Sequence, residues 1–258
     1  MLSSNTNKEL FHGDGIEFTT WLDLQTLFPE EIYLIQKYLQ PNLKTVEAGT
    51  NGGRILLRMQ EMGFTNLAGF DYVPELIEQA IERDPQRQID FQVQDAISLS
   101  YPDNSFEQIL YLQQITCVIE STADRFKALQ EAYRILATGG TGLFSFLSFE
   151  SRNAGFIYAS YITYLRAFRK LRGDNRSIQN LPWLKLGGKF NPRSLVDRHP
   201  YTYWYRVSEI YELLQSVGFE IVGIGTNPQI SADDMKATDR QLLAEQMSGM
   251  LYVVVKKK

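Results

Sequence analysis

Residues 43–53 read LKTVEAGTNGG, and this stretch decides the fold of the chain. Its first half is apolar enough to predict a strand, and the glycines that follow predict a sharp turn at the strand's end. Such a turn lets backbone amides approach a ligand and points the N-terminus of the next helix toward it. We therefore expect a ligand site where this strand ends.

The chain after this turn alternates between short apolar runs and helix-like patterns as far as Leu147. Further strands are predicted at 67–71, 89–94, 106–112, 142–147, 219–225 and 250–256, and helices at 51–62, from Pro74 onward, at 121–137 and at 207–217. The helix at 121–137 is expected to stop at Gly139-Gly140, a C-cap signal. This alternation predicts βαβ units and a parallel sheet.

Asp71 lies 22 residues after Gly49, at the end of the predicted second strand. A carboxylate at that place can accept hydrogen bonds from both hydroxyls of a ribose. A dinucleotide fingerprint would need glycine where this chain has Asn51 and Arg54, and the chain has no GKS or GKT of a phosphate-binding loop. The pattern therefore favours a nucleoside without phosphates and leaves a nicotinamide-dependent oxidoreductase as the less favoured alternative.

Six ordered motifs resemble those of class I methyltransferases that use S-adenosylmethionine (SAM), and the small-molecule, type 11-like branch is the most similar. They are EAGTNGG (47–53), FDYVPE (70–75), QDA (94–96), PDNSFE (102–107), EAYRILATGG (131–140) and LLQSVGF (213–219). Asn51 departs from the family pattern by replacing the middle glycine of the first motif. The resemblance implies an α/β, Rossmann-like sheet of seven strands, mostly parallel, in the order 3-2-1-4-5-7-6 with strand 7 antiparallel. It also implies SAM as the cofactor.

The resemblance further implies which residues hold SAM. Gly49 and its neighbours Glu47, Thr50, Asn51 and Gly53 would lie against the methionine part, and Asp71 would hold the ribose. Tyr72 would pack on the adenine, Asp95 would accept from its N6 with the Ala96 backbone beside it, and Gln113 would line the cofactor near the methyl group. Purely structural roles are the alternative: Asp95 can cap a helix and Tyr72 can belong to the core.

Residues 151–206 break the alternation and differ in composition from the rest of the chain. They contain 11 aromatic residues and 11 basic residues against two acidic ones, a net charge of +9 that leaves −13 for the remainder of a chain at −4. We expect a helical insertion between strands 5 and 6 that covers the substrate site, because strand 5 ends at the same sheet edge as strand 1. A solvated helical cap without a role in recognition is the alternative. The whole chain, 1–258, is expected to form a single methyltransferase domain with an N-terminal helical segment, 1–42.

Candidate catalytic residues come from the insertion. Methyl transfer from a sulfonium needs a general base only if the acceptor must lose a proton early. His199 is the candidate base or substrate-orienting group, and Tyr201 and Tyr203 lie near it in sequence. With Cys117 as its only cysteine and two histidines far apart, the chain is not expected to bind a metal.

The sequence thus predicts methyl transfer from SAM to a small-molecule acceptor, anionic or aromatic. A non-catalytic SAM-binding protein is one alternative. An RNA methyltransferase is another, since stacking side chains beside positive charge suit unpaired bases; the net charge of −4 makes nucleic acid the less favoured partner. Cysteine usage and the lack of a long apolar run predict a cytoplasmic protein without a membrane span. The oligomeric state stays open.

Overall fold

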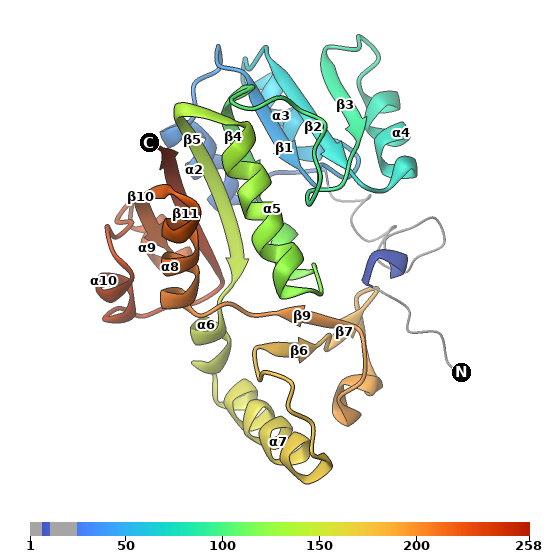
Figure 1. The fold of residues 1–258 in the computed structure, drawn as a ribbon, viewed down its shortest axis with the longest axis vertical. Helices are drawn as coiled ribbons and strands as arrows, with labels where there is room; N and C mark the ends of the chain where they lie inside the picture. The colour runs from blue at the N-terminus through green and yellow to red at the C-terminus, as the bar shows by residue number, and fades with distance from the viewer. Residues whose placement is uncertain (1–6, 11–24) are drawn as a thin grey trace.

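The computed structural model describes residues 7–10 and 25–258. The expected N-terminal helical segment, 1–42, lies partly outside the described residues. Its described part contains a short 3-10 helix, η1 (Asn7–Leu10), and helix α2 (Pro29–Tyr38). The chain forms a central sheet with helices on both faces, and a smaller assembly of helices and short strands lies beyond one edge of this sheet (Figure 1).

Seven strands form the central sheet in the order β10-β11-β5-β4-β1-β2-β3. They are β1 (Thr45–Ala48), β2 (Leu67–Asp71), β3 (Ile89–Val93), β4 (Phe106–Tyr111), β5 (Leu136–Leu147), β10 (Phe219–Gly225) and β11 (Met250–Lys257). Strands β1 to β5 pair in parallel, and β11 pairs antiparallel with both β5 and β10. The predicted order, with an antiparallel seventh strand, is therefore confirmed.

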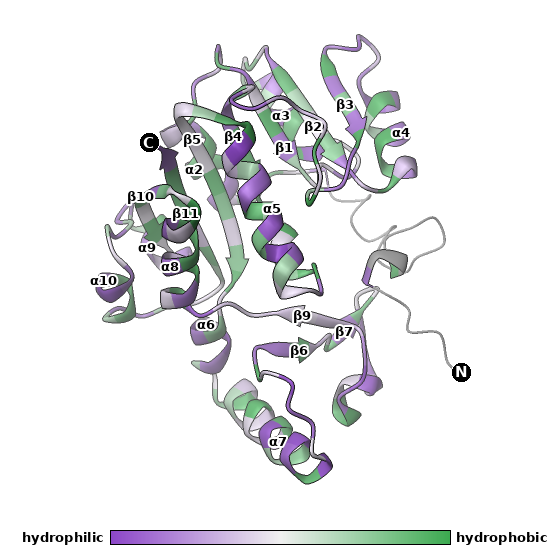
Figure 2. Cartoon of the chain, in the orientation of Figure 1, coloured by the Kyte–Doolittle hydropathy of each residue, from purple (hydrophilic) through white to green (hydrophobic). Residues whose placement is uncertain are grey.

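Helices bury the two faces of the sheet. One face packs against α5 (Thr122–Ile135), α8 (Val207–Val217) and α10 (Asp239–Leu243), and the other against α2, α3 (Arg54–Glu61), α4 (Pro74–Arg83) and α9 (Asn227–Ser231). Along β11, Val253 and Val255 belong to the first core and Tyr252 and Val254 to the second. Because both faces are covered, β11 is buried and apolar on both sides from Leu251 to Val255 rather than in alternate positions, and Figure 2 shows green along much of the central strand β5.

The residues between α5 and the core of β5 differ from the prediction. Helix α5 begins after Ser121, whose hydroxyl accepts from the Asp124 amide, but it ends at Ile135. Gly139 and Gly140 lie inside β5 and do not cap the helix. A Cβ on Gly140 would lie 2.8 Å from the carbonyl oxygens of both Ala137 and Glu107, so the close approach of the backbone requires glycine here.

The insertion that follows β5 is only partly helical. It contains α6 (Phe149–Asn153), α7 (Phe156–Arg172), a 3-10 helix η3 (Pro192–Val196) and two small antiparallel pairs, β6 (Asn180–Pro182) with β9 (Tyr201–Tyr203) and β7 (Lys185–Leu186) with β8 (Lys189–Phe190). Gly173, at a φ of +66°, ends α7. The adjacent glycines 187 and 188 both have positive φ and form the turn of the β7–β8 hairpin.

A buried ion pair joins the N-terminal helix to the main fold. Arg54, the first residue of α3, makes two hydrogen bonds of 2.7 Å with the carboxylate of Glu31 from α2, and Glu31 is fully buried. The Arg54 guanidinium also donates to the Thr26 carbonyl. Helix α2 is thereby fixed against the turn that follows β1.

We expect Glu31→Ala to lower the free energy of unfolding by about 3–5 kcal/mol, because it leaves the Arg54 guanidinium buried without its counter-charge. Urea denaturation measures this. Glu61→Ala is the matched control, since Glu61 forms an ion pair of 2.6 Å with Arg58 at the surface, and exposed pairs contribute about 1 kcal/mol or less. Equal losses for the two variants would contradict the assigned importance of the buried pair.

Candidate functional site

A cavity of about 660 Å³ lies at the carboxyl edge of the parallel strands, between the sheet and the insertion. Pockets of ~300–1,000 Å³ are typical of small-molecule sites. Seven of the ten predicted cofactor residues line it: Gly49, Asn51, Asp71, Tyr72, Asp95, Ala96 and Gln113. The insertion contributes Arg152, Tyr158, Trp183, Lys185, Thr202 and Trp204, among others. The cavity therefore joins the predicted cofactor residues to the segment expected to cover them.

The turn after β1 is built from alternating left-handed residues. Gly49, Asn51 and Gly53 have φ values of +61°, +49° and +78°. Asparagine tolerates this region better than most residues, and the Asn51 side chain donates to the Gly49 carbonyl at 3.3 Å. Asn51 therefore adopts the same left-handed backbone conformation as Gly49 and Gly53, although the family motif has glycine at its position.

Asp71 is held rigidly at the end of β2. Its two carboxylate oxygens accept from the amides of Asn51 and Val73, each at 3.1 Å, and the residue is 5% exposed. The next strand ends at a second carboxylate: Asp95 accepts from the Ile97 amide at 3.2 Å. The parallel register therefore places two carboxylates of neighbouring strands, with Tyr72 between them in sequence, on one wall of the cavity.

Gln113 and Gln114, directly after β4, both have positive φ, 58° and 70°. Non-glycine residues in this region store strain that the surrounding structure must hold, and such residues cluster at functional sites. The Gln113 side-chain amide donates to Glu31 Oε1 at 2.6 Å, and the Gln114 amide donates to the Ser145 hydroxyl at 3.3 Å. The buried carboxylate of Glu31 therefore supports the loop after β4 as well as α3.

Three of the predicted cofactor residues lie outside the cavity lining. The Thr50 hydroxyl donates to Glu47 Oε2 at 2.7 Å, and both residues are buried. Gly53 caps α3, and a Cβ there would lie 2.9 Å from the Phe91 ring. Burial raises the pKa of Glu47 to about 8, with the hydrogen bond from Thr50 and the charge of Arg54 opposing this rise.

The insertion's side of the cavity is aromatic and cationic. The Arg152 guanidinium lies 3.5 Å from the ring centre of Tyr158 and 4.6 Å from that of Trp204. Within the described part of the chain, no carboxylate forms an ion pair with Arg152. Burial lowers the pKa of this guanidinium from its ordinary value, but a guanidinium stays charged at neutral pH. Sequence analysis gave Arg152 no role of its own, because composition does not show which basic residue faces inward.

The predicted catalytic residues lie beside the cavity rather than in its lining. Tyr201 donates to the Asp197 carbonyl and Tyr203 to Glu209 Oε1, each at 2.5 Å, so both hydroxyls are engaged within the insertion and α8. His199 Nε2 lies 3.1 Å from Glu120 Oε1, and Glu120 does line the cavity. His199 contacts the cavity wall through its side chain, whereas Tyr201 does so through its carbonyl, which accepts from Asn7. The catalytic roles of these residues stay predictions.

Asn7 of η1 is a cavity residue that sequence analysis did not find. Its side-chain amide donates to the carbonyls of Val118 and Tyr201, at 2.9 and 2.7 Å, and its backbone amide donates to Glu120 at 2.7 Å. Asn7 is 3% exposed. It therefore bridges the segment after β4 and the insertion, a connection of more than 110 residues in sequence that no local pattern reveals.

Among residues 7–10 and 25–258, no three or more histidine, cysteine or carboxylate side chains are grouped so that they could hold a metal ion. In the same ranges, no helix is both long and apolar enough to cross a membrane. Cys117 is buried, and burial raises the pKa of its thiol to about 12, which keeps the thiolate scarce at neutral pH.

Comparison with known proteins agrees with this geometry. Residues 46–144 match the family model described as a methyltransferase domain. A SAM-dependent methyltransferase from Methanosarcina mazei superposes with a TM-score of 0.64 at 18% identity, over 90% of this chain and 98% of that one. A Haloferax volcanii protein solved in complex with the Trm112 methyltransferase activator gives 0.59 at 15% identity, over 93% of each chain. The [4+2]-cyclase SpnF gives 0.56 at 17% identity, over 88% of this chain and 80% of that one.

The solved structures, all below 20% identity, agree with this chain in fold. The family model matches this chain in sequence as well, from β1 into β5. The matched residues include the turn after β1 and the carboxylates that follow the next two strands. Residues 46–144 therefore match the methyltransferase-domain family, and the fold is that of SAM-dependent methyltransferases of known structure, so these findings indicate SAM as the cofactor.

We expect Asp71→Ala to weaken SAM binding by about 1–3 kcal/mol, the cost of removing charge-assisted hydrogen bonds. Isothermal titration calorimetry with SAM and its demethylated product measures this. Asp90→Ala is the control, because Asp90 is an exposed carboxylate on the neighbouring strand β3. Unchanged affinity in Asp71→Ala would remove Asp71 from the cofactor site.

The raised pKa of Glu47 makes stability depend on pH. The folded protein keeps the proton up to a pH of about 8, whereas the unfolded chain releases it near the ordinary value of 4.5. The contribution of Glu47 to stability is therefore greatest at acidic pH and falls as the pH rises to about 8. Glu47→Gln retains an acceptor for Thr50 but does not titrate.

We expect the free energy of unfolding of Glu47→Gln, relative to the unsubstituted protein, to increase steadily from about pH 5 to about pH 8. Urea denaturation of the SAM-free protein at several pH values measures this difference. A difference that does not vary with pH would show that Glu47 ionises normally in the folded protein.

Proposed function

We propose that the protein transfers the methyl group of SAM to a small-molecule acceptor that combines a flat apolar part with an anionic group. The observation that carries this proposal is the continuity of the cavity. Gly49 and Asp71 line one end, at the edge of the sheet, and Trp204 and Arg152 line the other, in the insertion. Cofactor and acceptor can therefore meet in one continuous cavity.

The sheet end of the cavity suits a nucleoside. Asp71 has both oxygens oriented by backbone amides and faces the cavity, which fits the two hydroxyls of a ribose. Tyr72 offers a ring to the adenine, and Asp95 offers a carboxylate to its amino group. The turn at Gly49 and Asn51 leaves room for the methionine part, and Glu47, Thr50 and Gly53 support this turn from behind.

The insertion end suits the acceptor. Trp183, Trp204 and Leu184 provide an apolar wall, and Tyr158 provides a further ring. The Arg152 guanidinium lies over the rings of Tyr158 and Trp204 and lines the cavity, and guanidinium N–H groups suit an oxyanion. We therefore assign residues 151–206 as the segment that selects the acceptor and covers the cofactor.

SAM supplies a methyl group that is already activated, so the protein's residues have to orient the acceptor and exclude water. The acceptor atom forms a bond to the methyl carbon as the carbon–sulfur bond breaks. An acceptor that carries a proton must release it. Glu120 lines the cavity, and Asn7 and His199 position its carboxylate. We therefore assign to Glu120 the acceptance of this proton, and to His199 a positioning role.

The test is a screen with methyl-labelled SAM against aromatic carboxylates and their neutral amides. We expect methylation of carboxylates in preference to amides, and we expect Arg152→Ala to lower kcat/KM for the carboxylates by about tenfold to a hundredfold. This range corresponds to the loss of one charge-assisted hydrogen bond of about 1.5–3 kcal/mol. SAM affinity, measured by calorimetry, should stay unchanged.

Arg206→Ala provides the matched control. Arg206 also belongs to the insertion and also lies over an aromatic ring, that of Phe149, but it is outside the cavity lining. We expect its kcat/KM to remain close to that of the unsubstituted protein. Equal use of amides and carboxylates would refute the anionic acceptor, and transfer to none of the compounds would refute the acceptor class as a whole.

A further inference from the structure

The outward side of α7 is apolar. The helix buries Ile162, Leu165 and Arg169 against the insertion. On its opposite side, Phe156, Ile157 and Leu171 are 86%, 80% and 87% exposed, and Tyr164 is 43% exposed. Ile157, Tyr164 and Leu171 are seven residues apart, about two turns, so they lie along one line of the helix. An ordinary surface helix shows the reverse arrangement, with its polar side toward solvent.

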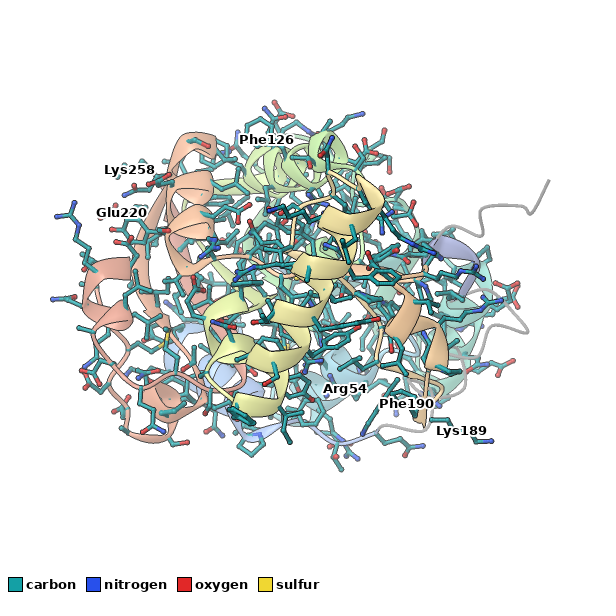
Figure 3. The ribbon with its side chains drawn as sticks, turned by 90° about the horizontal axis from the view of Figure 1, so that it is seen from below. Arg54, Phe126, Lys189, Phe190, Glu220 and Lys258 are labelled. Atoms are coloured by element: carbon teal, nitrogen blue, oxygen red, sulfur yellow. The ribbon has the colours of Figure 1, made fainter. Side chains whose placement is uncertain are left out.

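The neighbouring 3-10 helix extends this surface. The hydroxyls of Tyr161 and Tyr164 donate to the carbonyls of Ser194 and Leu195, at 2.7 and 2.6 Å, which fixes η3 beside α7. Leu195 and Val196 of η3 are 47% and 42% exposed. We call Phe156, Ile157, Tyr164, Leu171, Leu195 and Val196 the apolar face; Figure 3 views the molecule from the side on which α7 lies nearest to the reader.

Positive charges surround the apolar face. Arg166, Lys170 and Arg172 of α7 are exposed, as are Arg193 and Arg198 in and after η3. Helix α7 contains no acidic residue, and none of these five cations forms an ion pair within the described residues. The one buried carboxylate nearby, Asp197, is already paired with Arg169 at 2.7 Å.

We propose that the apolar face binds the surface of a lipid bilayer that contains anionic lipids. Helices that lie in a membrane surface have this construction, with apolar side chains inserted below the headgroups and Lys and Arg at the headgroup level. Charge complementarity identifies the lipids as anionic. Because α7 belongs to a folded domain, the protein would attach to one side of the bilayer.

A second copy of the chain fits this face less well. A two-fold contact would place the same surface patch of both copies together. It would bring Arg166, Lys170 and Arg172 of one copy against those of the other, with no carboxylate from either α7 between them. The apolar residues also project from a convex helix, and a fluid bilayer can adapt to such projections without a matching groove.

The experiment is flotation of the purified full-length protein with vesicles of phosphatidylcholine alone and of phosphatidylcholine mixed with phosphatidylglycerol. We expect binding to the mixed vesicles, weakened by added salt, and little binding to the neutral ones. Phe156→Ser/Ile157→Ser/Leu171→Ser should weaken binding at least about tenfold. Arg166→Gln/Lys170→Gln should weaken it by about fivefold for each charge removed.

Leu243→Ser is the matched control, because Leu243 is an exposed leucine on a different helix, α10, and is 43% exposed. It should bind vesicles as the unsubstituted protein does. Circular dichroism and SAM affinity confirm that each variant is folded. The proposal fails if the unsubstituted protein does not float with the mixed vesicles, or if the triple variant floats equally well. It also fails if light scattering shows a dimer that the triple variant converts to a monomer, because the occupant would then be a second copy.

Discussion

The bidentate ion pair between Glu31 and Arg54 is the interaction on which the sheet side of the cavity depends. It joins α2 to the start of α3 and so fixes from behind the turn that follows β1. The same carboxylate accepts from Gln113, which has a left-handed backbone at the end of β4. Glu47 lies in the same buried group, and burial raises its pKa so that it need not add a second negative charge. A buried pair of this kind specifies geometry more than it adds net stability, and removing one partner is costly because the other remains buried.

That support matters because the loops it holds are strained. Asn51, Gln113 and Gln114 all have positive φ without being glycine, and each such residue costs about 1–3 kcal/mol. The strain persists only where neighbouring contacts over-determine the backbone, as Asp71 does for the amide of Asn51 and Glu31 for the side chain of Gln113. The cavity therefore has a wall whose shape is set before any ligand arrives, which reduces the ordering that binding would otherwise require.

The strand order, and the residues that line the sheet side of the cavity, could be predicted from sequence because their signals are local. The turn at 49–53 and the carboxylate of Asp71 stand at fixed distances from strands that hydrophobic patterns reveal. Long-range partners could not be predicted in this way. Arg54 was recognised only as a departure from a dinucleotide motif, whereas its role comes from Glu31, 23 residues earlier in the chain. The insertion was predicted to be helical, and helix α7 agrees with this prediction. The short strands β6 to β9 lie after α7, and the helical pattern does not predict them.

Because sequence patterns do not reveal long-range partners, the sequence of the insertion suggested His199 and Tyr203 as site residues and did not suggest Arg152. The composition of the insertion shows only that it contains eleven basic residues. The fold places these residues in different environments. Arg169 is neutralised by Asp197 in the insertion's core, and Arg152 lies over the rings of Tyr158 and Trp204 on the cavity wall. Arg166 and Lys170 remain in solvent beside the apolar side of α7. A guanidinium that is partly withdrawn from water interacts more strongly with an anion than one in bulk solvent, since the effective dielectric is lower. One run of positive charge thus contributes to stability through Arg169, and we propose that it also recognises the acceptor through Arg152 and an anionic surface through Arg166 and Lys170.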